Sequence, residues 1–529
     1  MFSKLTKCIS TGISNFADFS QSQLLRALSK KYPDFLEVLE VLESIDGPQN
    51  VDEVESPDDQ DDGRWRPMLL TIGTYPILFF TKKSLKKVVK ICLHLSLSSC
   101  KVQNFFHFDE FLLGLLYKLQ KIEDSREGHW YNSPEIFVRN DEEEAEMLNV
   151  YGFYWHLIIK VAGVLRSAEA DHSPEGQDQI KAMLQEALGP DNIEALIANA
   201  TDDQVVEEHC PDFALLLDHT HQMIVINICG TRMIPAPKMS DVFMDLYAKA
   251  EPFLNGVAHQ GMAIGANNIL EKCSSQLTEA TDKYPEYGVL VTGYSLGAGI
   301  CQLVAMKLLQ DGSSNVRCVS YGAPLVYAGD DQDQGKNLFS VVCSHDGLAS
   351  TSLSTVSKLM AQVRAVDRLQ YRKRDMIKLL MKKIQTDEGT EMKEEDDSED
   401  DEDFDKDKLS GKPKITLSED WQIIRDAIQD AQADEGVVQL KHPAKNILVF
   451  KRRPTGEVVT RYFQDDCVQH FAESLRLRGA MFNHHMPWSY KSLFAGYGED
   501  TSAVPLEMVQ KVLRYCNPIV LKMIHDNLV

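Results

Sequence analysis

The chain has 529 residues, 43% of them hydrophobic and 25% charged, which is an ordinary composition for a soluble globular protein and leaves room for two to four domains. Its 79 acidic and 55 basic residues give a formal net charge of −24, which argues against a nucleic-acid partner. The 11 cysteines are scattered without zinc-ligand spacing, and the N-terminus has no apolar signal core. We therefore expect a metal-free cytoplasmic protein that touches membranes only peripherally.

The first 200 residues are predicted to form a mainly helical region. Residues 145–170 are strongly apolar at helical spacing. Residues 82–99 form a basic amphipathic stretch, which is one of two segments that could contact a membrane surface.

From residue 201 onward, short apolar runs alternate with helical stretches. This alternation is typical of an α/β fold with a largely parallel sheet. The first two strands are separated by the polar turn "HTHQ", which predicts a hairpin. The predicted strands are 213–218, 223–230, 287–293, 316–322 and 338–344, and the predicted helices between them are 258–280 and 298–311.

The stretch "VLVTGYSLGAGIC" places a serine, Ser295, between Gly293 and Gly297 at a strand-to-helix junction. A G-x-S-x-G pattern in this context is typical of a nucleophile elbow, in which a side chain at either glycine would collide with the neighbouring strand or helix. The backbone N–H of Leu296, the residue after the nucleophile, is then a predicted oxyanion donor. An ordinary glycine-rich turn with an inert serine is the alternative.

A serine nucleophile needs a base and an orienting carboxylate, which on this fold follow it in the order acid, then histidine. The strand 338–344 ends just before Asp346, at the sheet edge where catalytic groups collect, so Asp346 is the predicted acid. A plain Asp-Gly turn is the alternative for that residue. Three other aspartates follow the nucleophile in a polar loop: Asp330, Asp331 and Asp333.

The base is predicted to be one of two adjacent histidines, His484 and His485, in the stretch "MFNHHMPWSY" between apolar and aromatic residues. The other downstream histidines are His442, His470 and His525. Of these, His470 and His525 lie in helical stretches, so we expect structural roles for those two.

Five motifs in this order resemble those of the class 3 lipases, and among them the sn-1-specific diacylglycerol lipases. The stretches are "VINICGTRM", "VAHQGM", "VTGYSLGAG", "SHDGLASTSLSTVSKL" and "NHHMPWSYKSL", and the resemblance spans about residues 140 to 500. They resemble the family patterns I-R-G-T, V-H-x-G-[FM], G-H-S-L-G-A-G, N-D-[VI]-[VI]-P-R-L-S and D-H-x-P-x-x-Y, in the same order.

The resemblance implies an α/β-hydrolase fold with Ser295 as nucleophile, Asp346 as acid and His485, the second residue of D-H-x-P, as base. It also implies that Thr231 supplies an oxyanion donor, for which an ordinary strand-end turn is the alternative. The implied substrate is an acyl ester of a lipid, most specifically diacylglycerol. No cofactor is implied, although calcium dependence occurs in the family.

The chain departs from the family at several positions. Tyr294 replaces the usual histidine of the elbow, Cys229 replaces an arginine, Ala349 stands near a usual arginine, and His484 stands where the family has aspartate. The four-helix transmembrane N-terminus of the diacylglycerol lipases has no counterpart, which implies a soluble or peripheral relative. A hydrolase of another ester, such as a lysophospholipid or thioester, and a non-catalytic lipid-binding scaffold are the alternative functions.

The region after residue 200 is expected to have three parts. The hydrolase core, 201–386, carries the nucleophile and acid, and 416–529 completes it with the catalytic histidine. Between them, 387–415 is predicted to be a disordered acidic insert, because residues 387–407 hold 14 Asp/Glu and only two Lys.

Two segments are candidates for controlling access to the site. Residues 233–253 follow the predicted oxyanion residue, where class 3 lipases carry a lid; a helix packed on the core is the alternative. Residues 358–384 combine apolar positions at helical spacing with a basic face, which is typical of a membrane-surface helix. A core-packed helix with a solvated basic face is the alternative there.

Overall fold

The structure is a computed structural model, and it describes the following residues: 116, 119–120, 141–168, 173–189, 192–200, 209–232, 238–312, 315–329, 332–369, 419–452, 458–464, 466–477, 481–499 and 504–515. The basic stretch 82–99 and the acidic insert 387–415 lie outside these residues, so both stay predictions.

The described residues are organised around an eight-stranded sheet with the order β1-β2-β3-β6-β7-β9-β10-β11. The five central strands, β3, β6, β7, β9 and β10, run parallel, and antiparallel strands add to both edges. The strands are β1 Ile193–Asn199, β2 Phe213–Asp218, β3 Met223–Ile228, β6 Gly288–Tyr294, β7 Val316–Tyr321, β9 Leu338–Cys343, β10 Asn446–Arg452 and β11 Val458–Gln464. The predicted α/β-hydrolase architecture is therefore confirmed.

The five predicted strands are present, and the structure adds β1, β10 and β11. Strand β1 pairs with β2 along its length, so the predicted division at residue 200 separates two hydrogen-bonded neighbours. Strand β10 pairs in parallel with β9, which joins the chain segments on the two sides of the acidic insert in one sheet.

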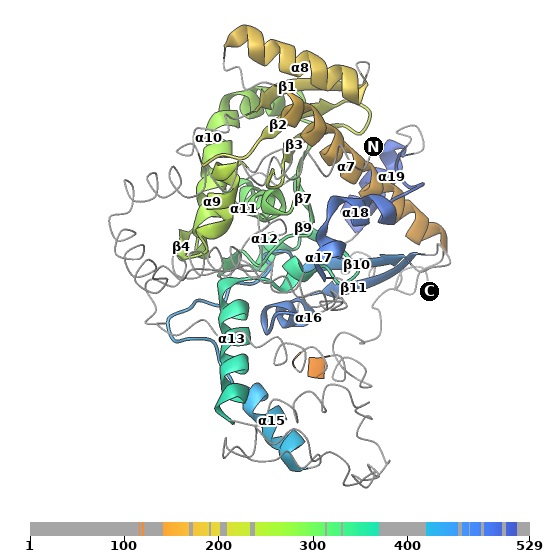
Figure 1. The fold of residues 1–529 in the computed structure, drawn as a ribbon. Coiled ribbons are helices and arrows are strands. Elements are labelled where there is room, and N and C mark those ends of the chain that lie inside the picture. The colour runs from red at the N-terminus through yellow and green to blue at the C-terminus, as the bar shows by residue number, and fades with distance from the viewer. Residues whose placement is uncertain are drawn as a thin grey trace, which may run out of the picture.

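Helices cover both faces of this sheet (Figure 1). One large hydrophobic core lies on the face under α7, and two cores lie on the other face. Strand β2 shows the division: Ala214 and Leu216 belong to the core under α7, whereas Phe213, Leu215 and Leu217 belong to the core under α10 and α11. Side chains alternate between the faces of a strand, so a fully apolar strand supplies both cores.

The helices are α7 Asp141–Ser167, α8 Pro174–Leu188, α9 Met239–Leu246, α10 Gln260–Lys283, α11 Leu296–Gln310, α12 Gln332–Gly335, α13 Leu353–Arg368, α15 Glu419–Gln429, α16 Asp466–Gln469, α17 Met481–His485, α18 Pro487–Leu493 and α19 Leu506–Tyr515. Two 3-10 helices span Gly347–Ser350 and His470–Ala472, and a small second sheet contains β4 Ala250–Phe253, β5 Gly256–His259 and β8 Tyr327–Ala328.

One helix within the described ranges, α7, is long and apolar enough to cross a membrane. Most of its apolar window is buried in the protein, and its side chains Tyr151 and Trp155 are fully enclosed in the core. Its apolar composition is thus accounted for by packing against the sheet, α18 and α19.

Candidate active site

Ser295 occupies the predicted turn between β6 and α11, with φ 59° and ψ −121°. Such a conformation is strained for a residue with a Cβ and is held by its surroundings. A Cβ on Gly293 would lie 2.9 Å from the carbonyl oxygen of Ile228, and one on Gly297 would collide with the same oxygen. Both glycines are therefore required for α11 to pass this close to β3.

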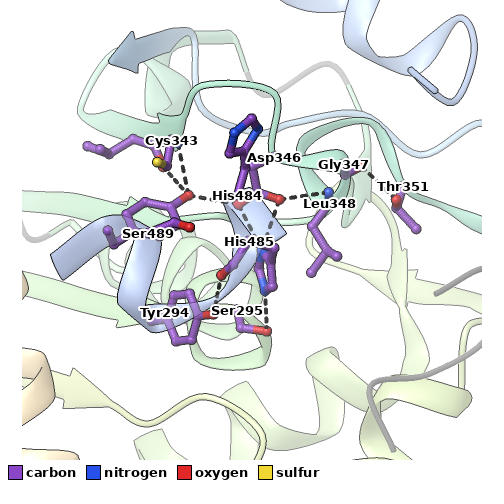
Figure 2. Close-up of polar contacts among 12 residues, drawn as sticks. Tyr294, Ser295, Cys343, Asp346, Gly347, Leu348, Thr351, His484, His485 and Ser489 are labelled. Carbon is purple, nitrogen blue, oxygen red and sulfur yellow. Dashed lines mark hydrogen bonds and ion pairs between the residues drawn. The ribbon is translucent and has the colours of Figure 1, made fainter. Parts of the chain in front are cut away.

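The structure brings Ser295, His485 and Asp346 into one line of hydrogen bonds (Figure 2). His485 Nε2 lies 3.1 Å from Ser295 Oγ. His485 Nδ1 lies 2.9 and 2.8 Å from the two carboxylate oxygens of Asp346. In this arrangement the carboxylate orients the imidazole, and the imidazole can accept the serine proton.

Asp346 is fixed by two further donors. The backbone N–H of Leu348 donates to Oδ1 at 2.9 Å, which caps the 3-10 helix that follows β9. The hydroxyl of Tyr490, on α18, donates to Oδ2 at 2.8 Å and accepts the N–H of Cys343 at 3.2 Å. Both oxygens of the Asp346 carboxylate therefore accept hydrogen bonds from the protein, in addition to the contact with His485.

Burial moves the pKa values of the acid and the base in opposite directions. Burial raises the pKa of Asp346, and the hydrogen bonds from the Tyr490 hydroxyl and the Leu348 N–H offset part of this rise. The resulting pKa is about 7. Burial lowers the pKa of His485, so the imidazole is neutral at neutral pH and its Nε2 can accept the proton of Ser295.

The other candidate acids and bases do not join this line. His484 accepts the backbone N–H of His345 at its Nδ1 (3.3 Å), and the buried His442 lies 2.7 Å from the carbonyl oxygen of Ala349. His470 pairs with Glu473 on the surface. The alternatives Asp330, Asp331 and His525 lie outside the described residues, and no side-chain position is described for Asp333.

The predicted oxyanion residues flank the nucleophile. Leu296 is the first residue of α11, and Thr231 lies three residues beyond Ile228, the last residue of β3. A Cβ on Gly230 would lie 2.6 Å from the carbonyl oxygen of Tyr294, so this chain segment runs directly beside the elbow. The Thr231 hydroxyl donates to Asp245 on α9 at 2.8 Å, and Arg166 on α7 donates to the carbonyl of Gly230 at 3.1 Å.

A buried ion cluster links Arg232 to the start of α9. Lys238, fully buried, lies 2.7 Å from Asp212 and 3.6 Å from Asp241. Asp241 in turn accepts the backbone N–H of Arg232 at 3.0 Å. Together with the Thr231–Asp245 hydrogen bond, these contacts tie α9 to Thr231 and Arg232.

The nucleophile and the base are buried. Ser295 is only 3% exposed and His485 is not exposed at all. In the predicted lid 233–253, residues 233–237 lie outside the described residues, while Met244 of α9 is fully buried.

The second access candidate, 358–384, is described up to residue 369, most of it within α13. Its apolar positions Leu359, Val363 and Val366 are buried. This burial supports the core-packed alternative for the described part of the segment.

Four residues around the site had no role in the sequence predictions: Tyr490, Tyr294, Trp155 and Gly322. Tyr490 ends the motif D-H-x-P-x-x-Y, which was its only signal. Gly322, at φ +61°, is placed so that a Cβ would meet Asp346 Oδ2 at 2.7 Å and His485 Cε1 at 2.9 Å. No group of His, Cys, Asp and Glu that could hold a metal ion occurs within the described ranges.

Comparison with known proteins gives the same family that the motifs indicate. Residues 225–355 match the family Lipase (class 3). Diacylglycerol lipase-beta of Mus musculus is 32% identical over 120 residues, which are 21% of this chain and 17% of that protein. Diacylglycerol lipase-alpha of Homo sapiens is 30% identical over 145 residues, 24% of this chain and 13% of that protein. The matched stretches thus span less than a fifth of either relative.

Solved structures with similarity to the chain include several fungal lipases. Rhizomucor miehei triacylglyceride lipase is 16% identical, with 40% of this chain and 74% of that chain covered and a TM-score of 0.30. Lip2 lipase from Yarrowia lipolytica is 19% identical, with 30% and 61% covered and a TM-score of 0.26.

Proposed function

Since residues 225–355 are class 3 lipase sequence, we propose that this chain is a serine hydrolase that cleaves acyl esters of lipids through an acyl-enzyme. The single observation that carries the proposal is the continuous hydrogen-bonded line from Ser295 through His485 to Asp346. Residues far apart in the chain meet there in the geometry that nucleophilic catalysis requires.

In the proposed mechanism Ser295 Oγ attacks the ester carbonyl while His485 Nε2 accepts the hydroxyl proton. Asp346 holds Nδ1 and stabilises the imidazolium that forms. The same proton then passes from Nε2 to the departing alcohol. Water, activated by His485, releases the fatty acid and restores the serine.

The negative charge of the tetrahedral intermediate needs fixed donors at the nucleophile. The backbone N–H groups of Thr231 and Leu296 are the proposed pair. The loss of one such donor typically costs about 100- to 1000-fold in rate. The Thr231–Asp245 hydrogen bond and the Arg166–Gly230 contact support this assignment, because both hold the strand-end segment in place.

Diacylglycerol is the proposed substrate, since two relatives named diacylglycerol lipases match the catalytic segment at 30–32% identity. The enclosed nucleophile fits a lipid substrate, because an apolar acyl chain would be transferred into a site that excludes water. A cytoplasmic, membrane-peripheral location belongs to the same proposal.

A fluorophosphonate probe tests the nucleophile directly. The wild-type protein should be labelled, and Ser295→Ala should lose the label and fall by about 10⁶-fold in hydrolysis, as happens when a triad nucleophile is removed. Full labelling of the Ser295→Ala protein would contradict the proposal.

The substrate is tested by fatty-acid release from diacylglycerol, triacylglycerol, lysophospholipid and an acyl thioester under matched conditions. Preferred release from diacylglycerol supports the assignment, and preferred release from another ester replaces it. A protein that neither labels nor hydrolyses any of them would be a non-catalytic lipid-binding scaffold on the same fold.

A further inference from the structure

Tyr294 stands inside the nucleophile elbow, where the resembling family has histidine, and its side chain reaches the proposed base instead of solvent. Its hydroxyl donates to the backbone carbonyl of His485. Its ring lies nearly parallel to the imidazole, with the ring centroids 5.1 Å apart and an interplanar angle of 19° (Figure 2).

These two contacts restrain the face of the His485 ring and its backbone carbonyl, which neither Ser295 nor Asp346 contacts through the triad hydrogen bonds. Ser295 and Asp346 hold the two ring nitrogens along the edge of the imidazole. Tyr294 stacks on a face of the ring and donates a hydrogen bond to the backbone carbonyl of His485, the last residue of α17. Stacking and hydrogen bonding together limit both the tilt of the ring and the position of its backbone.

Tyr294 is itself wedged in place by α7. Trp155 packs edge-on against it, with centroids 5.3 Å apart and an interplanar angle of 84°. The same indole stacks on Tyr490, the partner of Asp346, at 4.9 Å and 28°. Trp155 therefore packs against both Tyr294, which stacks on His485, and Tyr490, which donates to Asp346.

We propose that Tyr294 is a positioning residue that fixes the His485 imidazole against Ser295, with Trp155 of α7 as its support. The inference rests on the proposed function of the triad and adds to it a residue from the nucleophile's own elbow. Because Tyr294 and Ser295 are neighbours in the chain, the backbone that places the nucleophile also places the surface on which the base lies.

Three variants separate the contacts. Tyr294→Phe keeps the stacked ring and removes the hydroxyl; Tyr294→Leu removes both; Tyr321→Phe is the control. Tyr321 is an equally buried tyrosine of the same aromatic group, and its hydroxyl donates to the carbonyl of Tyr151 at 2.5 Å, away from the base. Both phenylalanine variants lose one buried hydrogen bond, so their thermal midpoints should fall similarly.

The measurements are kcat and KM on a soluble short-chain ester, the rate of fluorophosphonate labelling, and the pH profile of kcat/KM. We expect kcat to fall about 5-fold in Tyr294→Phe and about 100-fold in Tyr294→Leu, as a misplaced reacting group does, with KM within twofold of wild type. Tyr321→Phe should keep kcat. In Tyr294→Leu the acidic limb should move to higher pH, since burial lowers the pKa of His485 and the smaller side chain admits water.

The outcomes distinguish the two proposals. If Ser295→Ala still labels, the triad assignment fails whatever the tyrosine variants do. If Ser295→Ala is inert but the Tyr294 variants match Tyr321→Phe in kcat and pH profile, the positioning role alone is overturned. Should Tyr294→Leu fail to fold, the kcat difference between the two phenylalanine variants decides the question.

Discussion

Gly322 offers a sharp test of how tightly the acid and base are packed. It follows β7 at φ +61° and lies against both members of the Asp346–His485 pair. Replacing it with alanine adds one methyl group without changing any polar atom of the site. The change therefore probes geometry alone.

The structure sets the size of the effect. A Cβ at this position would lie 2.7 Å from Asp346 Oδ2, where roughly 3.4 Å is needed, so the carboxylate or the backbone must move by about 0.7 Å. The ring of His485 is also in the way, with Nδ1 at 3.0 Å. Displacements of about 1 Å at a catalytic group cost roughly 100-fold in rate, so we expect Gly322→Ala to lose between about 10- and 100-fold in kcat.

The left-handed backbone adds a separate stability cost of roughly 1–2 kcal/mol for a residue with a Cβ. Gly312→Ala is the matched control, because Gly312 also has a positive φ, +94°, but open space around it. Thermal unfolding of the two variants should show losses of similar order, while fluorophosphonate labelling should slow only in Gly322→Ala. A folded Gly322→Ala protein that labels at the wild-type rate would refute the packing argument.

Three further predictions test the base, the buried acid and the ion cluster. Replacing His485 with alanine should abolish labelling nearly as completely as Ser295→Ala. His484→Ala should change the rate only modestly, since the described contacts of His484 are with the backbone N–H and the ring of His345 and not with Ser295 or Asp346; the reverse pattern in two folded proteins would exchange their roles. Because burial raises the folded-state pKa of Asp346 to about 7, its contribution to stability is full below its unfolded value of 3.8 and is lost as the pH rises through 7. Asp346→Asn should therefore gain about 3 kcal/mol relative to wild type between pH 5 and pH 8 in urea unfolding, and a pH-independent difference would contradict the shift. Lys238→Met should lose about 3–5 kcal/mol, because it leaves two carboxylates buried beside an apolar side chain, while Lys181→Met, which breaks an exposed pair, should lose less than about 1 kcal/mol; equal losses would show that burial does not matter here.

The sequence by itself determined the local features of the site. The elbow at Ser295 is readable because a strand, two glycines and a helix stand within one short stretch, and the collisions at Gly293 and Gly297 follow from that local geometry. Asp346 could be predicted for the same reason, since it lies three residues after the end of an apolar strand.

Local sequence did not decide which of two neighbouring histidines is the base. The residues alone left His484 and His485 open, and only the resemblance favoured the second. In the structure adjacent side chains of α17 point to different surroundings, and His485 meets a serine 190 residues away. A contact between residues so far apart in the chain depends on how α17 and α18 pack on the sheet, and no local sequence pattern encodes that packing.

Strands β1, β10 and β11 also needed the tertiary structure. Strands β1 and β11 lie at the edges of the sheet, where pairing with a neighbour helps to define the strand. Strand β10 does carry an apolar run, Ile447 to Phe450, but its place beside β9, across the acidic insert, is decided by the tertiary structure. The support given by Tyr294, Trp155 and Gly322 likewise has no signal in the sequence, and Tyr490 is marked there only as the last residue of a motif. Each of these residues contacts a residue distant in the chain. Such contacts form only when the helices pack on the two faces of the sheet.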